Sequence, residues 1–110
     1  MSSNSTRIRE LNDAFRMSFT GGKIYMAAGV AALDDAAKTK VLTTVRNFSA
    51  FSKDNDPYGE HDFGNFTIDD EKYFFKIDYY SSRDPDLGSE DPSDPNETER
   101  VLTIMLAEEY

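Results

Sequence analysis

The sequence contains no cysteine and a single histidine, His61, and these two shortages exclude several kinds of site. Without cysteine the chain has no disulfide, no thiolate zinc site and no thiol nucleophile. One histidine also excludes the paired histidines of a His-x-x-x-His zinc motif. Because the lack of cysteine fits a reducing compartment, we expect a cytoplasmic protein.

The chain also lacks long apolar runs and glycine-rich phosphate loops. Its first residues, MSSNSTRIRELNDAF, contain no apolar stretch long enough for a signal peptide or a membrane span. Neither a G-x-S-x-G nucleophile motif nor a dinucleotide-binding fingerprint occurs. We therefore expect no membrane attachment and no cofactor, and these absences favour a non-enzymatic role.

Basic residues are scarce in the second half of the chain. Residues 1–53 hold eight Lys/Arg and four Asp/Glu, a net charge of +4, whereas residues 54–110 hold four and seventeen, a net charge of −13. The whole chain carries −9. An acidic face repels nucleic acid, which binds through Lys and Arg, and attracts basic protein surfaces.

Two amphipathic helices are predicted in the first half. The first has apolar residues at helical spacing: Ile8, Leu11, Ala14, Phe15 and Phe19. Ser5 or Thr6 would cap its start, and Gly21-Gly22 would end it. The second runs from a cap at Asp34 to about Phe51. Between the two helices, we expect a short strand over residues 23–30.

Three further strands are predicted in the second half. Residues 63–68 and 73–80 alternate in polarity and are joined by a short polar turn, which predicts a hairpin. Residues 101–106 predict a last strand, although a helix is the alternative there. With 110 residues forming a single domain, 1–110, we expect an α+β fold of order αβαβββ, with two helices on one face of a four-stranded, mainly antiparallel sheet.

The alternation along residues 73–80 separates two faces of the sheet. The residues expected in the core are Tyr73, Phe75, Ile77 and Tyr79. The residues expected on a partly exposed face are Phe74, Lys76, Asp78 and Tyr80. The second face could support a homodimer through Phe74 and Tyr80, so both a monomer and a homodimer remain open.

The segment NDPYGEHDFG, residues 55–64, holds the candidate catalytic residues Glu60, His61 and Asp62. Imidazole and carboxylate groups can hold a metal or transfer protons. In a regular strand, however, Glu60 and Asp62 would share one face and His61 would point to the other. Convergence would need an irregular backbone and further ligands, so we expect no metal site.

A structural interpretation of the same segment is favoured. Asn55, Asp56, Pro57 and Gly59 are the residue types that a turn requires. His61 would then be a hydrogen-bonded strap that holds the turn to the sheet.

Residues 81–98 predict an extended acidic loop that contains three of the four prolines. Its candidate partner-binding carboxylates are Asp84, Asp86, Glu90, Asp91, Asp94 and Glu97. Carboxylates spaced along a rigid loop can take the places of phosphates on a basic surface.

Four segments carry a resemblance to a known family: LNDAFR (11–16), VRNFSAFSKDNDPYGEHDFG (45–64), FFKIDYY (74–80) and VLTIMLAEEY (101–110). They resemble small bacterial proteins catalogued only as a domain of unknown function, common in alphaproteobacteria and often carried on plasmids or other mobile elements. The resemblance implies one compact domain and no established activity, so it assigns no catalytic residue.

Two functions follow as hypotheses. The first is a small acidic protein-binding module, an inhibitor of the anti-CRISPR or anti-restriction type, which occupies a basic nucleic-acid-binding surface of a host defence protein and does not itself bind nucleic acid or membrane. The alternative is a metal-assisted or acid–base hydrolase centred on His61, with Glu60 and Asp62 in support.

Overall fold

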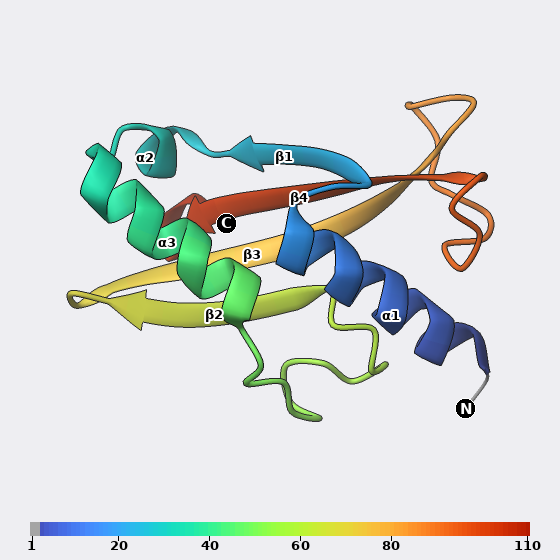
Figure 1. Cartoon of the computed structure of the whole chain (residues 1–110), viewed down its shortest axis with the longest axis horizontal. Coiled ribbons are helices and arrows are strands. Elements are labelled where there is room, and N and C mark those ends of the chain that lie inside the picture. Colours follow the sequence, from blue (N-terminus) through green and yellow to red (C-terminus); the bar gives the residue numbers. More distant parts are fainter. Residues whose placement is uncertain (1–2) are drawn as a thin grey trace.

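A computed structural model describes residues 3–110 of the chain (Figure 1). Its helices are α1 (Ser3–Ser18), α2 (Ala28–Ala31) and α3 (Asp35–Asn47). Its strands are β1 (Gly22–Met26), β2 (Phe63–Ile68), β3 (Glu71–Ser81) and β4 (Thr98–Leu106). A short 3-10 helix, η1 (Ala107–Glu109), follows β4 directly.

The four strands form one sheet in the order β1-β4-β3-β2. The β2–β3 and β3–β4 pairs are antiparallel, whereas β1 runs parallel to β4 at the edge of the sheet. The expected α+β class and the order αβαβββ are confirmed, with α2 as one additional turn. The sheet is mixed because the first strand of the chain pairs with the last one.

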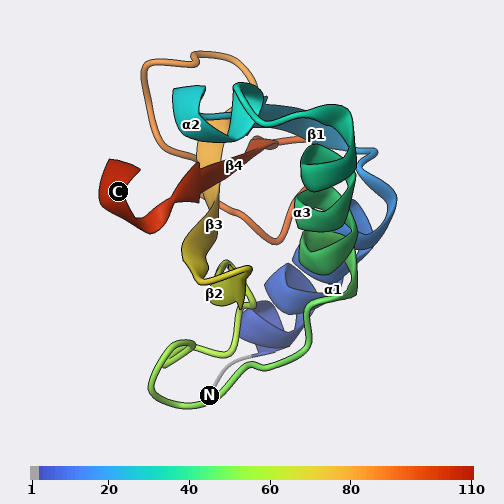
Figure 2. The same cartoon turned by 90° about the vertical axis from the view of Figure 1, so that its left-hand side faces the viewer.

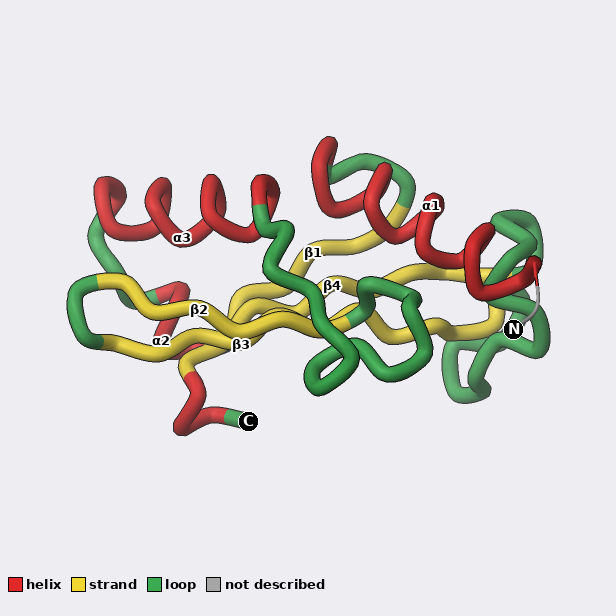
Figure 3. The backbone as a smooth tube through the Cα atoms, turned by 90° about the horizontal axis from the view of Figure 1, so that it is seen from below, coloured by secondary structure: helices red, strands yellow, loops and turns green. Residues whose placement is uncertain are grey.

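Helices α1 and α3 lie on the same face of the sheet, which Figures 2 and 3 show from two sides. Their buried residues pack on the central strands: Phe15, Val41 and Val45 face Tyr73, Phe75, Ile77, Leu102 and Ile104. Each such side chain contributes about 1.5–3 kcal/mol by leaving water. The expected core residues of β3 are confirmed, although Tyr79 is only half-buried.

Two predicted boundaries are wrong. The strand expected over residues 23–30 ends at Met26, because the alanines that follow favour a helical turn and α2 places Val30 in the core. The helix expected to reach Phe51 ends at Asn47, where the buried Arg16 side chain takes over the last carbonyl groups.

The predicted start of α3 is confirmed, whereas the predicted start of α1 is wrong. Asp34 caps α3 as expected, since its carboxylate accepts a hydrogen bond of 2.8 Å from the backbone N–H of Ala37. Helix α1 begins at Ser3, so Ser5 and Thr6 lie inside it and are not its cap.

Residues 101–106, for which a helix was the alternative, belong to strand β4. This strand extends over Thr98–Leu106 because β3 and β1 hydrogen-bond to its two sides. Within residues 3–110, none of the helices has the length and apolar character needed to cross a bilayer.

Candidate functional site

The loop before β2 holds the motif of residues 55–64. His61 has a φ of +57°, in the left-handed region, so the segment from Glu60 to Asp62 is not a regular strand. The buried Asp56 closes this loop, because its Oδ1 accepts hydrogen bonds from the backbone N–H groups of Glu60 (3.0 Å) and His61 (3.1 Å). With this irregular backbone, the Glu60 and His61 side chains bind different partners.

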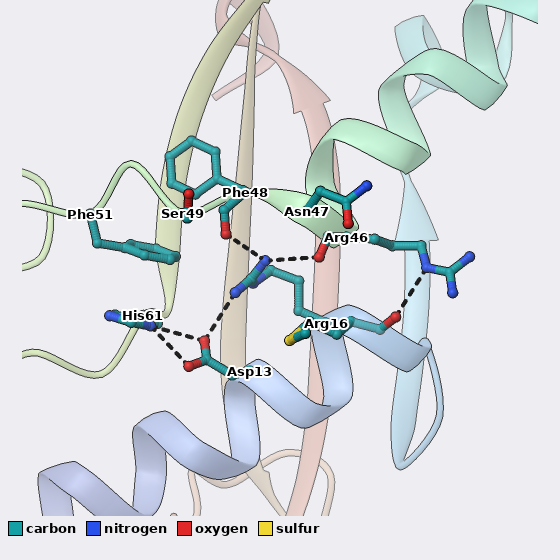
Figure 4. A pocket seen from close by; sticks show the side chains of 9 residues that line it. Asp13, Arg16, Arg46, Asn47, Phe48, Ser49, Phe51 and His61 are labelled. Atoms are coloured by element: carbon teal, nitrogen blue, oxygen red, sulfur yellow. Dashed lines mark hydrogen bonds and ion pairs between the residues drawn. The ribbon is translucent and has the colours of Figure 1, made fainter.

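The His61 imidazole lies between the carboxylates of Asp13 and Asp56, and Figure 4 shows its contact with Asp13. Its Nδ1 lies 2.9 Å and 3.1 Å from the two carboxylate oxygens of Asp13 in α1, and its Nε2 lies 3.6 Å from Oδ2 of Asp56. The ring also stacks on Phe51, with centroids 3.8 Å apart and planes 5° apart. These contacts tie the loop to α1, so His61 straps the turn to a helix and not to the sheet.

Asp13 also binds the guanidinium group of Arg16, at 3.0 Å from Nη2. Arg16 is 3% exposed, and its Nη1 donates to the carbonyls of Val45 (2.9 Å) and Phe48 (3.0 Å) at the end of α3. A single carboxylate therefore connects the motif loop with the junction of α1 and α3. A pocket of about 280 Å³ lies beside this cluster, as Figure 4 shows.

Glu60 belongs to a second polar network, which includes Asn12 of α1. The Tyr79 hydroxyl donates to Oε1 of Glu60 at 2.8 Å, and the Asn12 amide donates to the Tyr79 oxygen (2.8 Å) and to the Glu60 carbonyl (3.0 Å). Arg100 completes the network by donating from Nε to Oδ1 of Asn12 at 2.7 Å. Burial raises the pKa of Tyr79 and lowers that of Arg100.

The Asp62 carboxylate forms no hydrogen bond with the described residues of either network. Its backbone carbonyl accepts a hydrogen bond of 2.8 Å from the backbone N–H of Ile77. Burial raises the pKa of its carboxyl, and the negative charges of Glu60, Asp56 and Asp78 raise it further. In the part of the chain that the structure describes, no group of three or more His, Cys, Asp or Glu side chains is arranged to hold a metal ion.

The acidic loop between β3 and β4 folds into a series of tight turns at one end of the molecule (Figure 1). Three aspartates accept a hydrogen bond from the backbone N–H two residues later: Asp84 from Asp86 (3.0 Å), Asp91 from Ser93 (3.1 Å) and Asp94 from Asn96 (2.9 Å). Glu97 forms an ion pair with Arg83 at 3.2 Å. The backbone of the loop is thus shaped by its own carboxylates.

The same loop is anchored to the sheet. Backbone hydrogen bonds join Ser81 to Leu87 (2.8 Å) and Ser89 to Tyr79 (3.0 Å), and Arg100 donates from Nη2 to the carbonyl of Pro92. Of the six candidate binding carboxylates, Asp84, Asp86, Glu90 and Asp91 are exposed, and Asp94 and Glu97 are half-buried. The structure therefore holds these residues together on one loop, away from His61.

A protein-family model matches residues 26–109 of the chain. The chain belongs to this family, DUF3768, which is described as a protein of unknown function. No curated protein and no solved structure matches it. The part that matches DUF3768 contains the motif loop and the acidic loop, whereas α1, with Asn12, Asp13 and Arg16, precedes it.

Sequence reasoning missed the α1 side of both networks in this DUF3768 protein. One signal could have found Asn12, because it follows Ile8 by four residues and precedes Phe15 by three, so it lies on the apolar stripe of the helix. A polar residue on a buried stripe needs hydrogen-bond partners. Asp13 and Arg16 gave no such signal, since charged residues at this spacing are typical of a solvated helix face.

Proposed function

We propose that this DUF3768 protein is a protein-binding module whose acidic loop, residues 82–97, docks on a basic surface of another protein. The observation that carries the proposal is the fixed shape of the loop. Its turns are closed by Asp84, Asp91 and Asp94, and Arg100 holds it to the sheet through Pro92. A loop ordered before binding loses little conformational entropy when a partner docks.

The charge of the loop determines the kind of partner. Residues 54–110 carry a net charge of −13, which speeds the encounter with a positively charged surface and repels nucleic acid. Carboxylates at fixed spacing can occupy the positions that phosphates take on a basic groove. A protein that binds nucleic acid through Lys and Arg is therefore the partner class that fits best.

The resemblance of the chain to proteins carried on bacterial mobile elements supports a narrower form of the proposal. In that form the protein is a cytoplasmic inhibitor of the anti-CRISPR or anti-restriction type. It competes with nucleic acid for the basic surface of a host defence protein.

The test is a charge reversal that leaves the loop turns intact. The Asp86 and Glu90 carboxylates are exposed and accept no hydrogen bond within residues 3–110, so Asp86→Lys/Glu90→Lys alters charge without removing a turn. The partner is first isolated from the native host and purified. Its association rate with the double variant should fall by at least tenfold at low salt, with a smaller fall at high salt.

Asp54→Lys/Glu108→Lys is the matched control, because it changes the net charge equally at exposed positions outside the loop. A nucleic-acid competitor should displace the wild-type protein from its partner. Equal association rates for the two double variants would overturn the proposal, because the effect would then belong to net charge and not to the loop.

A hydrolase centred on His61 is the second candidate, and the pocket beside the Asp13–His61 pair favours it. In this role Asp13 would orient the ring through Nδ1, and Nε2 would transfer the proton, since its 3.6 Å separation from Asp56 is longer than a hydrogen bond. Glu60 accepts a hydrogen bond from Tyr79 through Oε1, so in this candidate the supporting carboxylate in contact with His61 is Asp13. Hydrolysis of ester or phosphodiester substrates that is lost in His61→Gln and retained in Glu60→Gln would support this candidate.

A further inference from the structure

The face of the sheet opposite α1 and α3 carries a hollow of about 370 Å³ next to the acidic loop. Side chains of β1, β3 and β4 line it, together with Pro85 of the acidic loop. Figure 3 shows that α1 and α3 leave this face uncovered. Tyr110 packs elsewhere on the face, against Phe63 and Phe74, with ring centroids 6.0 Å and 5.2 Å apart.

An aromatic ring and a carboxylate lie side by side in this hollow. Tyr80 of β3 and Glu99 of β4 are direct partners in the antiparallel register, so their side chains leave the sheet on the same face with Cβ atoms about 4.5–5.5 Å apart. The Tyr80 side chain is 37% exposed. Glu99 forms no ion pair and no side-chain hydrogen bond with any residue from 3 to 110.

The charged side chains that line the hollow are Lys23, Lys76, Asp78 and Glu99, so their formal charges balance. Lys76 is held by Asp78, with Nζ 3.0 Å from Oδ2, so these two charges balance. Lys23 of β1 also lines the hollow and lies outside ion-pair distance of every carboxylate described. Among residues 3–110, Glu99 is therefore the acidic side chain of this lining that lacks an ion-pair partner.

We propose that this hollow binds an arginine side chain of the basic partner, with the guanidinium plane on the Tyr80 ring and its N–H groups directed to Glu99. The proposal rests on the proposed function, which supplies the partner. A guanidinium group can stack on a ring and donate two parallel hydrogen bonds to a carboxylate, whereas an ammonium group is a compact, strongly hydrated charge. The hollow therefore distinguishes arginine from lysine, which the acidic loop alone does not.

The probe is a pair of blocked peptides of one sequence, acetyl-Gly-Arg-Gly-Arg-Gly-amide and its lysine counterpart. Each is titrated into the full-length, ¹⁵N-labelled protein and followed by NMR. The arginine peptide should bind about threefold to fivefold more tightly than the lysine peptide, which is the size of a cation–π contact at an exposed site. The largest chemical-shift changes should fall on Tyr80, Glu99 and Val101.

Two variants and a control locate the effect. Tyr80→Leu removes the ring and Glu99→Gln removes the charge, and each should reduce arginine binding to the level of lysine. Tyr80→Phe is the control, because it keeps the ring and should keep the preference. Equal binding of the two peptides to the wild-type protein, or a preference that survives Glu99→Gln, would overturn the inference.

The outcomes separate this inference from the proposed function. If Asp86→Lys/Glu90→Lys still slows association with the partner but the peptides bind equally, the acidic loop is the binding surface and the hollow is not an arginine site. If the arginine preference is found while the loop variant associates normally, the hollow stands and the docking role of the loop fails.

Discussion

Asn12 of α1 and Arg100 of β4 are joined by a hydrogen bond of 2.7 Å, although 88 residues separate them in the chain. Asn12 also donates to the carbonyl of Glu60 in the motif loop, and Arg100 donates to the carbonyl of Pro92 in the acidic loop. Two buried side chains thus connect the two loops that sequence analysis had treated as separate candidate sites.

Replacing Asn12 by alanine should destabilise the fold. The substitution leaves the Nε group of the buried Arg100 and the carbonyl of Glu60 without their partner, and an unsatisfied buried group costs about 1–3 kcal/mol. We expect the free energy of unfolding in urea to fall by about 2–3 kcal/mol. Asn47→Ala, at an exposed position, should change it by less than about 0.5 kcal/mol. Similar values for both variants would contradict the role assigned to the network.

Asp13→Asn should weaken the contact between the motif loop and α1. The amide keeps the shape of the carboxylate but removes the charge that faces both Arg16 and His61. Because Asp13 is partly exposed, we expect a loss of about 1–2 kcal/mol at neutral pH and faster hydrogen exchange at the backbone N–H of His61. The exposed Asp54→Asn serves as the comparison, and unchanged exchange at His61 would count against the strap.

Gly64→Ala should destabilise the protein although glycine is usually the weaker strand former. A Cβ at Gly64 would lie 2.4 Å and 2.7 Å from ring atoms of Phe75 and 2.9 Å from the ring of Phe48, in the tightly packed core. Such overpacking costs about 1–3 kcal/mol. In Gly88→Ala the nearest atom is the Tyr79 carbonyl oxygen at 3.7 Å, an ordinary contact, so thermal unfolding of that variant should stay close to wild type.

Asp62→Asn should stabilise the protein at neutral pH. The pKa of Asp62 is raised in the folded state above its ordinary value of 3.8, so the folded protein binds this proton more tightly than the unfolded chain does. Stability is therefore lost as the pH rises from the unfolded pKa through the folded pKa, and the variant avoids that loss. We expect a gain of up to about 1 kcal/mol at about pH 7.

The gain from Asp62→Asn should vanish at about pH 3, where the carboxyl is protonated in both states. Urea unfolding at both pH values measures it, with the exposed Glu108→Gln as the control. A variant that is less stable than wild type at neutral pH would show that the Asp62 charge has a stabilising partner.

The elements that sequence analysis located correctly are those with a clear local pattern. The alternation in residues 73–80 separated Phe75 and Ile77 from Lys76, and the Asp34 cap placed the start of α3, because both signals are local. The parallel pairing of β1 with β4 carries no such signal, since it depends on how the helices cross the sheet. Helix α2 was missed for a related reason: Val30 is helical because the core accepts its side chain there.

The candidate site was only half predictable. The turn chemistry of Asp56 and the role of His61 as a strap followed from residue types, and the observed hydrogen bonds of Asp56 agree with that interpretation. The identity of the group that His61 contacts did not follow, because Asp13 lies 48 residues earlier in the chain. The left-handed φ of His61 could not be predicted from the sequence either, because the position is occupied by neither glycine nor asparagine, the residues that usually indicate this conformation.

The position of β4 between β1 and β3 has a consequence for synthesis on the ribosome. Residues 22–26 find their only strand partner at residues 100–104, so the sheet lacks its second strand until the end of β4 has left the exit tunnel. During translation β1 therefore stays unpaired while the β2–β3 hairpin can already form. A nascent chain whose residues 100–104 are still inside the tunnel lacks part of the sheet on which α1 and α3 pack, so it exposes apolar helix surface to chaperones.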